Sequence, residues 1–143
     1  MRNQPPPFHG SCLCGQIKYE VRSEIKAVTH CHCGICQKAH GAAFGSYGSV
    51  ALSDFSFTDG QAWVRSHASS PGVARTFCGA CGSPLTWHQA EGEWASWISL
   101  ALGTLDTPFT PHRHRQAHAG SRPPWSPDGG HAGSSPAEPP QSR

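Results

Sequence analysis

The stretch His30-Cys31-His32-Cys33-Gly34-Ile35-Cys36-Gln37-Lys38 places three cysteines within six residues and sets two histidines beside them. Zinc in proteins is usually held by four ligands in a tetrahedron, and cysteine thiolate is a preferred ligand. Three cysteines at C-x-C-x-x-C spacing can hold one ion from a single tight loop, which leaves a fourth position to be filled. A protein side chain there makes the site structural, whereas water or a substrate makes it catalytic. The function of the chain depends on this choice.

The residues around the loop leave three outcomes open. A nearby histidine (His30, His32 or His40) closes the fourth position, or the position stays open to an external thiol or water, or the thiols remain without metal. On an extended backbone, successive side chains point to opposite sides. The ring of His32 is therefore expected to point away from an ion bound by Cys31 and Cys33.

The other four cysteines form two pairs that lie far apart in the chain. Cys12 and Cys14 are spaced C-x-C on a predicted strand, where residues i and i+2 face the same way. Cys78 and Cys81 are spaced C-x-x-C in a glycine-containing turn. Together the pairs predict a structural zinc site with four cysteine ligands, which would cross-link a thin core. Other ligand combinations and a Cys78–Cys81 redox pair are the alternatives, but no βαβ pattern surrounds that pair.

Composition and charge limit the class of protein. The chain has 143 residues, 36% of them hydrophobic, with 16 glycines, 13 prolines and an odd count of 7 cysteines. An odd count in a reducing compartment favours metal binding over a disulfide framework. A net charge of +2 does not favour nucleic acid or anionic membranes as partners. No apolar run is long enough to span a membrane and no signal peptide is recognised, so a cytoplasmic location is expected.

The hydrophobic pattern predicts a mainly β fold of short antiparallel strands, with few or no long helices. One helical turn is expected over 37–40, ended by Gly41. The predicted domain covers 8–125, between a flexible lead over 1–7 and a disordered tail over 126–143 that is rich in Pro, Gly and Ser. Strands are predicted over 16–21, 25–30, 43–50, 55–58, 61–67, 73–77, 84–88 and 94–100.

Three motifs carry a resemblance to a known family. They are Gly10-Ser11-Cys12-Leu13-Cys14-Gly15, then Cys31-His32-Cys33-Gly34-Ile35-Cys36-Gln37-Lys38, then Phe77-Cys78-Gly79-Ala80-Cys81-Gly82-Ser83-Pro84-Leu85. With all seven cysteines at matching spacing, the chain resembles the glutathione-dependent formaldehyde-activating enzyme (GFA) family, which also includes centromere protein V. The resemblance runs from about Phe8 to about Gly129.

This resemblance implies a β-tent fold with two zinc ions. Cys12, Cys14, Cys78 and Cys81 would hold the structural zinc, and Cys31, Cys33 and Cys36 would hold the catalytic one. It also implies a carbon–sulfur lyase that joins a small-molecule thiol, glutathione, to formaldehyde and so makes S-hydroxymethylglutathione. The alternative is a zinc-stabilised binding module of the same fold without catalysis.

Residues outside the cysteine motifs are less informative. The carboxylates of glutathione need cationic partners, and the spacing does not select among the candidates Lys38, Arg65, Arg75 and Arg113. The tryptophans in strand-like segments (Trp63, Trp87, Trp94 and Trp97) are predicted to lie in or against the core. The histidines of the 112–118 segment are interpreted as solvated. His112 lies near where the family has a histidine-led strand, but the residues after it are more polar than that strand usually is.

Overall fold

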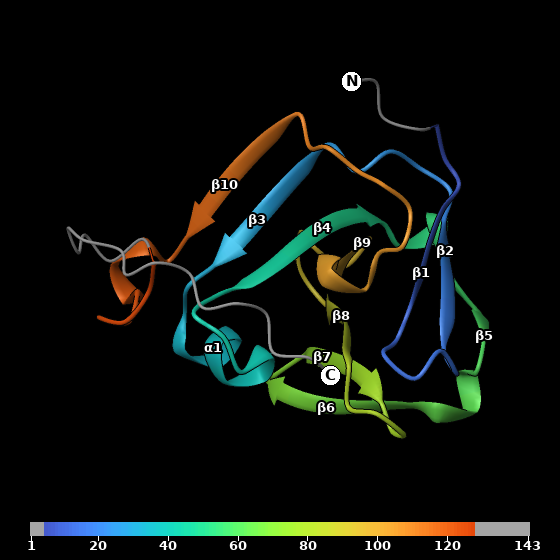
Figure 1. Cartoon of the computed structure of the whole chain (residues 1–143), viewed down its shortest axis with the longest axis horizontal. Helices are drawn as coiled ribbons and strands as arrows, with labels where there is room; N and C mark the ends of the chain where they lie inside the picture. The colour runs from blue at the N-terminus through green and yellow to red at the C-terminus, as the bar shows by residue number, and fades with distance from the viewer. Residues whose placement is uncertain (1–4, 128–143) are drawn as a thin grey trace, which may run out of the picture.

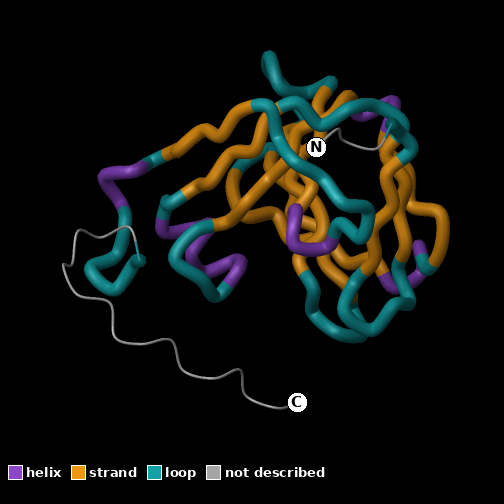
Figure 2. Tube along the Cα trace, turned by 45° about the horizontal axis from the view of Figure 1, so that its top comes forward, coloured by secondary structure: helices purple, strands orange, loops and turns teal. Residues whose placement is uncertain are grey.

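The computed structural model describes residues 5–127, and residues 128–143, most of the predicted tail, lie outside the described part of the chain. The described residues form mostly strands, with one α-helix, α1 (Gly34–His40), and short 3-10 helices. Figure 2 shows that the helical segments are brief and separate the strands. The strands are β1 (Phe8–Ser11), β2 (Lys18–Val21), β3 (Ala27–Cys31), β4 (Gly45–Ala51), β5 (Phe55–Asp59), β6 (Val64–Ser70), β7 (Val73–Cys78), β8 (Pro84–Gln89), β9 (Trp97–Ala101) and β10 (Arg113–Ala117). The 3-10 helices are η1 (Leu52–Asp54), η2 (Gln61–Trp63), η3 (Leu102–Thr104) and η4 (Ala119–Ser121).

The strands form two sheets, which confirms the predicted mainly β fold. A small sheet has the order β1-β2-β5, and a large sheet has the order β10-β3-β4-β9-β8-β7-β6 (Figure 1). All pairs are antiparallel except β10 with β3, which is parallel. The prediction of antiparallel strands was wrong for this pair. The chain returns across the molecule after η3 and enters β10 in the direction of β3, which the polar sequence of β10 did not indicate.

The main core lies between the two sheets. Tyr19 and Val21 of β2 face inward and are fully buried, whereas Lys18 is exposed, so the predicted alternation of this strand is confirmed. Val50 and Leu100 contribute from the large sheet. The hydroxyl of Tyr19 is satisfied by Thr104 Oγ1 at 2.8 Å, as a buried phenol requires.

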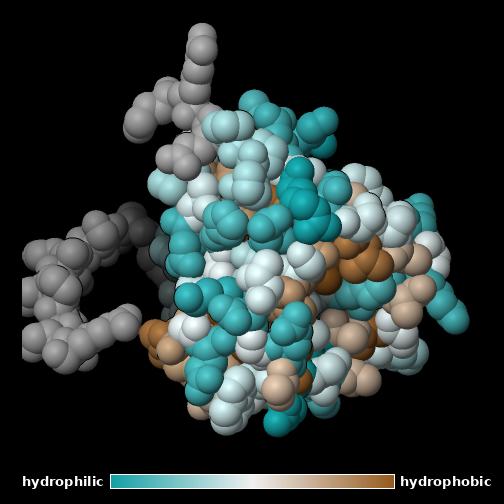
Figure 3. All heavy atoms as spheres, turned by 90° about the vertical axis from the view of Figure 1, so that its right-hand side faces the viewer, coloured by the Kyte–Doolittle hydropathy of each residue, from teal (hydrophilic) through white to brown (hydrophobic). Residues whose placement is uncertain are grey.

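The outward face of the molecule on the small-sheet side is mostly hydrophilic, with apolar residues visible in small groups (Figure 3). One side of an antiparallel sheet is commonly solvated while the other packs on the core. In the described part of the chain, no helix is long and apolar enough to cross a membrane.

Helix α1 begins earlier than predicted, inside the cysteine motif. Cys33 is the residue before its first turn, and its Sγ accepts a hydrogen bond from the Cys36 backbone N–H at 3.3 Å. This bond satisfies one of the amides that have no partner within the helix. The predicted end of the helix is confirmed, because Gly41 adopts the left-handed conformation (φ 58°) and its N–H bonds to Gln37 O.

The prediction that the strand tryptophans belong to the core was wrong for three of them. Trp63, Trp94 and Trp97 are 40%, 49% and 44% exposed. Trp63 lies in η2, Trp94 lies in the turn before β9, and Trp97 is the first residue of β9. Trp63 and Trp97 thus stand at element ends and Trp94 stands in a turn, outside the interiors of the strands. Trp87 of β8 is half-buried.

Candidate metal centres and the adjoining cavity

The structure brings the four cysteines of the first cluster together. The sulfur atoms of Cys12, Cys14, Cys78 and Cys81 all lie within 4.8 Å of one another. The Sγ atoms of Cys12 and Cys14 are 3.6 Å apart, and those of Cys14 and Cys78 are 3.8 Å apart. Cysteines 66 positions apart therefore form one compact group with the donor atoms that zinc prefers.

This cluster joins the two sheets. Cys12 directly follows β1 of the small sheet, and Cys78 is the last residue of β7 in the large sheet. Both cysteines are buried and belong to a second core cluster that also contains Ile17 and Leu85. A metal ion here would act as a cross-link inside the core.

A tight turn with a left-handed glycine closes each half of the first cluster. Gly15 follows the first pair and Gly82 follows the second, with φ angles of 80° and 81°. The Gly15 N–H bonds to Cys12 O at 3.0 Å, and the Gly82 N–H bonds to Cys78 O at 2.8 Å. A residue with a Cβ atom is strained at such φ values.

Hydrogen bonds to sulfur favour the thiolate form at two cysteines of this cluster, whereas the pKa of Cys14 is raised to about 11. The side chain of Ser83 lies 3.3 Å from Cys81 Sγ, and hydrogen bonds from Ser83 lower the pKa of Cys81 to about 5. Burial alone would raise the pKa of Cys12, but the Ile17 N–H, 3.3 Å from its sulfur, contributes to a net lowering. Thiolate is the form that binds metal.

The second cluster contains three sulfurs. Those of Cys31, Cys33 and Cys36 lie within 4.8 Å of one another. Cys31 ends β3, Cys33 caps α1, and Cys36 lies buried in the first turn of the helix. Burial raises the pKa of the Cys31 thiol to about 12. Burial also acts to raise that of Cys33, but the hydrogen bond from the Cys36 amide and the neighbouring thiols lower it overall.

None of the three candidate histidines joins the second cluster as a fourth donor in the described part of the chain. Each ring is engaged elsewhere. His30 contacts Ser46 Oγ at 2.8 Å and His114 Nδ1 at 2.9 Å. His32 Nε2 contacts Gln116 Oε1 at 2.7 Å, and His40 Nε2 contacts the hydroxyl of Tyr47 at 2.5 Å. The second cluster therefore offers three sulfur donors and no histidine nitrogen among the described residues.

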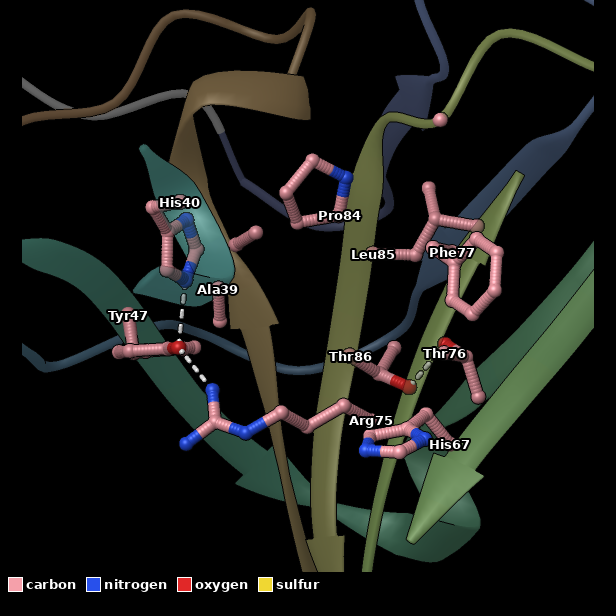
Figure 4. A pocket seen from close by; sticks show the side chains of 12 residues that line it. Ala39, His40, Tyr47, His67, Arg75, Thr76, Phe77, Pro84, Leu85 and Thr86 are labelled. Carbon is pink, nitrogen blue, oxygen red and sulfur yellow. Dashed lines mark hydrogen bonds between the residues drawn. The ribbon is translucent and has the colours of Figure 1, made fainter. Parts of the chain in front are cut away.

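A cavity of about 200 Å³ is lined by His40, Tyr47 and Arg75, and the last two of these also contact Cys36 Sγ. Three of its polar side chains form a connected group (Figure 4), in which the Tyr47 hydroxyl lies between the ring of His40 and the guanidinium of Arg75. Arg75 Nη1 donates to Tyr47 Oη at 2.9 Å, and Arg75 Nη2 lies 3.6 Å from Cys36 Sγ. Tyr47 Oη lies 3.9 Å from the same sulfur. The cavity wall and the Cys36 thiol are thus connected through the same two side chains, Tyr47 and Arg75.

The local sequence explains this crowding. Gly45 lies on β4 two residues before Tyr47, and a Cβ atom there would come within 2.8 Å of the His40 ring and 2.9 Å of the Tyr47 ring. Only glycine leaves room for the pair. The sequence analysis did not single out Tyr47, although glycine within a strand often marks a close approach.

Burial sets the protonation of this group. It lowers the pKa of His40, with a further contribution from the charge of Arg75, so the imidazole is neutral near pH 7. Burial raises the pKa of Tyr47, so the phenol keeps its proton. Since Arg75 can only donate, the Tyr47 oxygen accepts from it. The single phenol proton can then be donated either to His40 Nε2 or toward Cys36 Sγ.

The structure selects Arg75 from the four predicted cations. Arg75 is the one that lines the cavity among the described residues. Lys38, Arg65 and Arg113 are exposed, and Arg65 Nη1 donates to the nearby Ala62 O at 2.7 Å. The charge beside the second cluster thus comes from β7, far from the cysteine loop in sequence.

A more open hollow of about 470 Å³ lies beside His30 and His114. The two rings stack with centroids 5.2 Å apart and planes 10° from parallel. His114 is exposed, in agreement with the interpretation of the 112–118 histidines as solvated, and its ring also stacks on that of His30. Parallel pairing of β10 with β3 brings this ring against His30, and that pairing was not foreseen.

Comparison with known proteins agrees with this arrangement. The family model described as glutathione-dependent formaldehyde-activating enzyme matches residues 7–119. The chain belongs to this family. The GFA match includes all seven cysteines and the cavity residues Tyr47 and Arg75.

The fold of this family member also has a solved counterpart. A crystal structure of a Rhodobacter sphaeroides protein aligns with a TM-score of 0.60 and 18% sequence identity, and the alignment covers 74% of this chain and 98% of that one. At this identity the likeness concerns the fold. No significant match was found among curated proteins.

Proposed function

We propose that this chain is a zinc-dependent carbon–sulfur lyase of the GFA type, which joins glutathione or a related thiol to formaldehyde. The observation that carries the proposal is the second cluster, in which three sulfurs lie together without a histidine among residues 5–127 and contact Arg75 and Tyr47 of the cavity wall. The seven free cysteines fit a reducing compartment, and we therefore place the activity in the cytoplasm.

The donor sets fit two zinc ions of different kind. Cys12, Cys14, Cys78 and Cys81 form a complete set of four thiolates, which suits a closed structural site. The three thiols of the second cluster suit a site whose fourth ligand is exogenous. Zinc there would bind the substrate sulfur and favour its thiolate form at neutral pH.

The chain's own residues would act on the rest of the reaction. Addition forms one carbon–sulfur bond between the thiol and formaldehyde, breaks the carbonyl π bond, and moves the thiol proton to the carbonyl oxygen. Tyr47 and Arg75 present O–H and N–H donors at the cavity wall beside Cys36. Donors in this place stabilise the negative charge that develops on the aldehyde oxygen.

The same cavity restricts which thiol can react. Arg75 uses Nε on Ser69 Oγ at 2.9 Å, Nη1 on Tyr47 and Nη2 on Cys36 Sγ. The second N–H of each Nη atom can still meet a carboxylate. Guanidinium groups bind carboxylates with favourable planar geometry. This supports glutathione, which carries two carboxylates, over a thiol without charge.

The test is an assay of adduct formation from glutathione and formaldehyde, with the wild type, Arg75→Gln and Tyr47→Phe. We expect zinc-dependent activity that a chelator abolishes and added zinc restores. Arg75→Gln should lower kcat/KM roughly 10-fold to 100-fold, since hydrogen bonds from charged groups contribute about 1.5–3 kcal/mol. Arg65→Gln, at an exposed arginine, is the matched control. A zinc-loaded wild type that binds glutathione but forms no adduct would instead support the non-catalytic binding module.

A further inference from the structure

The C-terminal part of the domain is hydrogen-bonded to the loop that carries the second cluster. Strand β10 lies parallel to β3, and the pairing continues past the strand end, where the His32 N–H donates to Ala117 O at 2.9 Å. On the same strand, Gln116 Oε1 lies 2.7 Å from His32 Nε2. From the other side, Gln37 Nε2 donates to His32 O at 2.7 Å and to Ser121 O at 3.0 Å.

These contacts converge on one buried residue. His32 lies between Cys31 and Cys33 and is fully buried. Its backbone N–H, its carbonyl and its Nε2 are all hydrogen-bonded to groups outside the loop. Because an amide oxygen can only accept, the contact with Gln116 places the imidazole hydrogen on Nε2 and fixes the ring orientation.

The position of His32 controls the neighbouring sulfurs. Cys31 and Cys33 are joined to it directly, so a rotation of the 31–33 backbone moves both Sγ atoms. Groups that hold metal ligands in place typically change metal affinity 10-fold to 100-fold when they are removed. An unpartnered buried imidazole N–H would also cost free energy, which favours rearrangement of the loop.

We propose that Gln116 is a positioning residue for the second metal cluster, acting through His32, and that Gln37 serves the same purpose from α1. This inference rests on metal binding by Cys31, Cys33 and Cys36 in the proposed function. Neither glutamine is a ligand. The polar strand β10 thus supports the metal centre, because the side chain of Gln116 holds the loop of the second cluster in position.

The test measures zinc affinity at each cluster by competition with a chromophoric chelator, on the full chain. Gln116→Ala should bind zinc at the second cluster about 10-fold to 100-fold more weakly, while the first cluster keeps its affinity and serves as an internal reference. Gln116→Glu retains an acceptor oxygen for His32 and should recover most of the loss. Arg115→Ala removes a neighbouring exposed side chain of β10 and should change nothing.

A second variant separates positioning from folding. Gln37→Met removes the amide donor but keeps the length of the side chain, and we expect the same selective loss of zinc with an unchanged melting temperature. The proposal is overturned if Gln116→Ala keeps wild-type affinity, if both clusters weaken equally, or if the glutamate variant binds no better than the alanine variant. A wild type that binds no zinc at the second cluster would overturn the proposed function itself, which is a distinguishable result.

Discussion

The two cysteine clusters use the same ligand atoms but occupy different places in the fold. The first lies in a core, where Cys12 and Cys78 pack with Ile17 and Leu85 and link the small sheet to the large one. The second lies at the end of β3, against a helix and beside a cavity. Placement, more than ligand type, separates a cross-link from a reaction site.

The two clusters also differ in what holds their backbone in place. The first cluster is closed by two left-handed glycines, which hold the backbone tightly around four sulfurs. In the second, one ligand, Cys33, also caps a short helix, and the loop depends on contacts from Gln116 and Gln37. Each half of the first cluster is a local turn and the two sheets bring the halves together, whereas the second cluster is local in sequence and distant residues hold its loop.

The comparison is tested most severely by Cys81→Ser. Structural zinc contributes on the order of 10 kcal/mol in small zinc domains, which is comparable to the whole stability of a domain of this size. We expect loss of the cooperative thermal transition, measured by circular dichroism, and the same for Cys12→Ser. A folded Cys81→Ser protein with normal melting would remove the structural role of the first cluster.

Cys33→Ser should have the opposite outcome: a folded protein without activity. Serine is a good helix cap, so α1 keeps its first turn, while a ligand of the second cluster is lost. Metal analysis should show one zinc per chain in place of two, with the melting temperature within a few degrees of the wild type. Unfolding as complete as in Cys81→Ser would show that both clusters are structural.

Falling pH should release zinc from the second cluster first. A thiol must lose its proton to bind metal. In the first cluster the pKa of Cys81 is about 5 and that of Cys12 is lowered, which offset the raised pKa of Cys14, about 11. In the second cluster the pKa of Cys33 is also lowered, but burial raises that of Cys31 to about 12, so protons compete most strongly there. Zinc release monitored from about pH 8 to about pH 5 should occur in two steps. The Cys33→Ser variant, which keeps only the first cluster, shows which step belongs to that cluster. Release from the first cluster at the higher pH would contradict this order.

The smallest effects concern the glycines of the two clusters. Gly15→Ala and Gly82→Ala place a Cβ atom on left-handed backbone and should each destabilise the domain by about 1–2 kcal/mol. Gly34 begins α1 with open space around it, so Gly34→Ala should be neutral or stabilise the helix by up to about 1 kcal/mol. Chemical denaturation of the zinc-loaded variants measures the difference. Equal destabilisation at Gly34 would show that both loops are equally constrained.

Local pattern was enough for most of the strands and for the cysteine pairs and triplet that are close in sequence. Alternation predicted β2, and a C-terminal glycine predicted the end of α1, because both depend on neighbours in sequence. The start of α1 was missed because a cysteine side chain acts there as the cap. The exposure of Trp63, Trp94 and Trp97 was missed because it depends on where the helical and strand elements end, which was predicted only coarsely.

By itself, the sequence determined which atoms can bind metal, since C-x-C and C-x-x-C spacings place sulfurs within reach of one ion whatever surrounds them. Tertiary structure alone decided what each group adjoins. In the tertiary structure the three candidate histidines contact other side chains. Arg75 and Tyr47 lie beside Cys36, and β10 pairs with β3. Those contacts join residues distant in the chain, and their free energy depends on burial and geometry that spacing along the sequence does not encode.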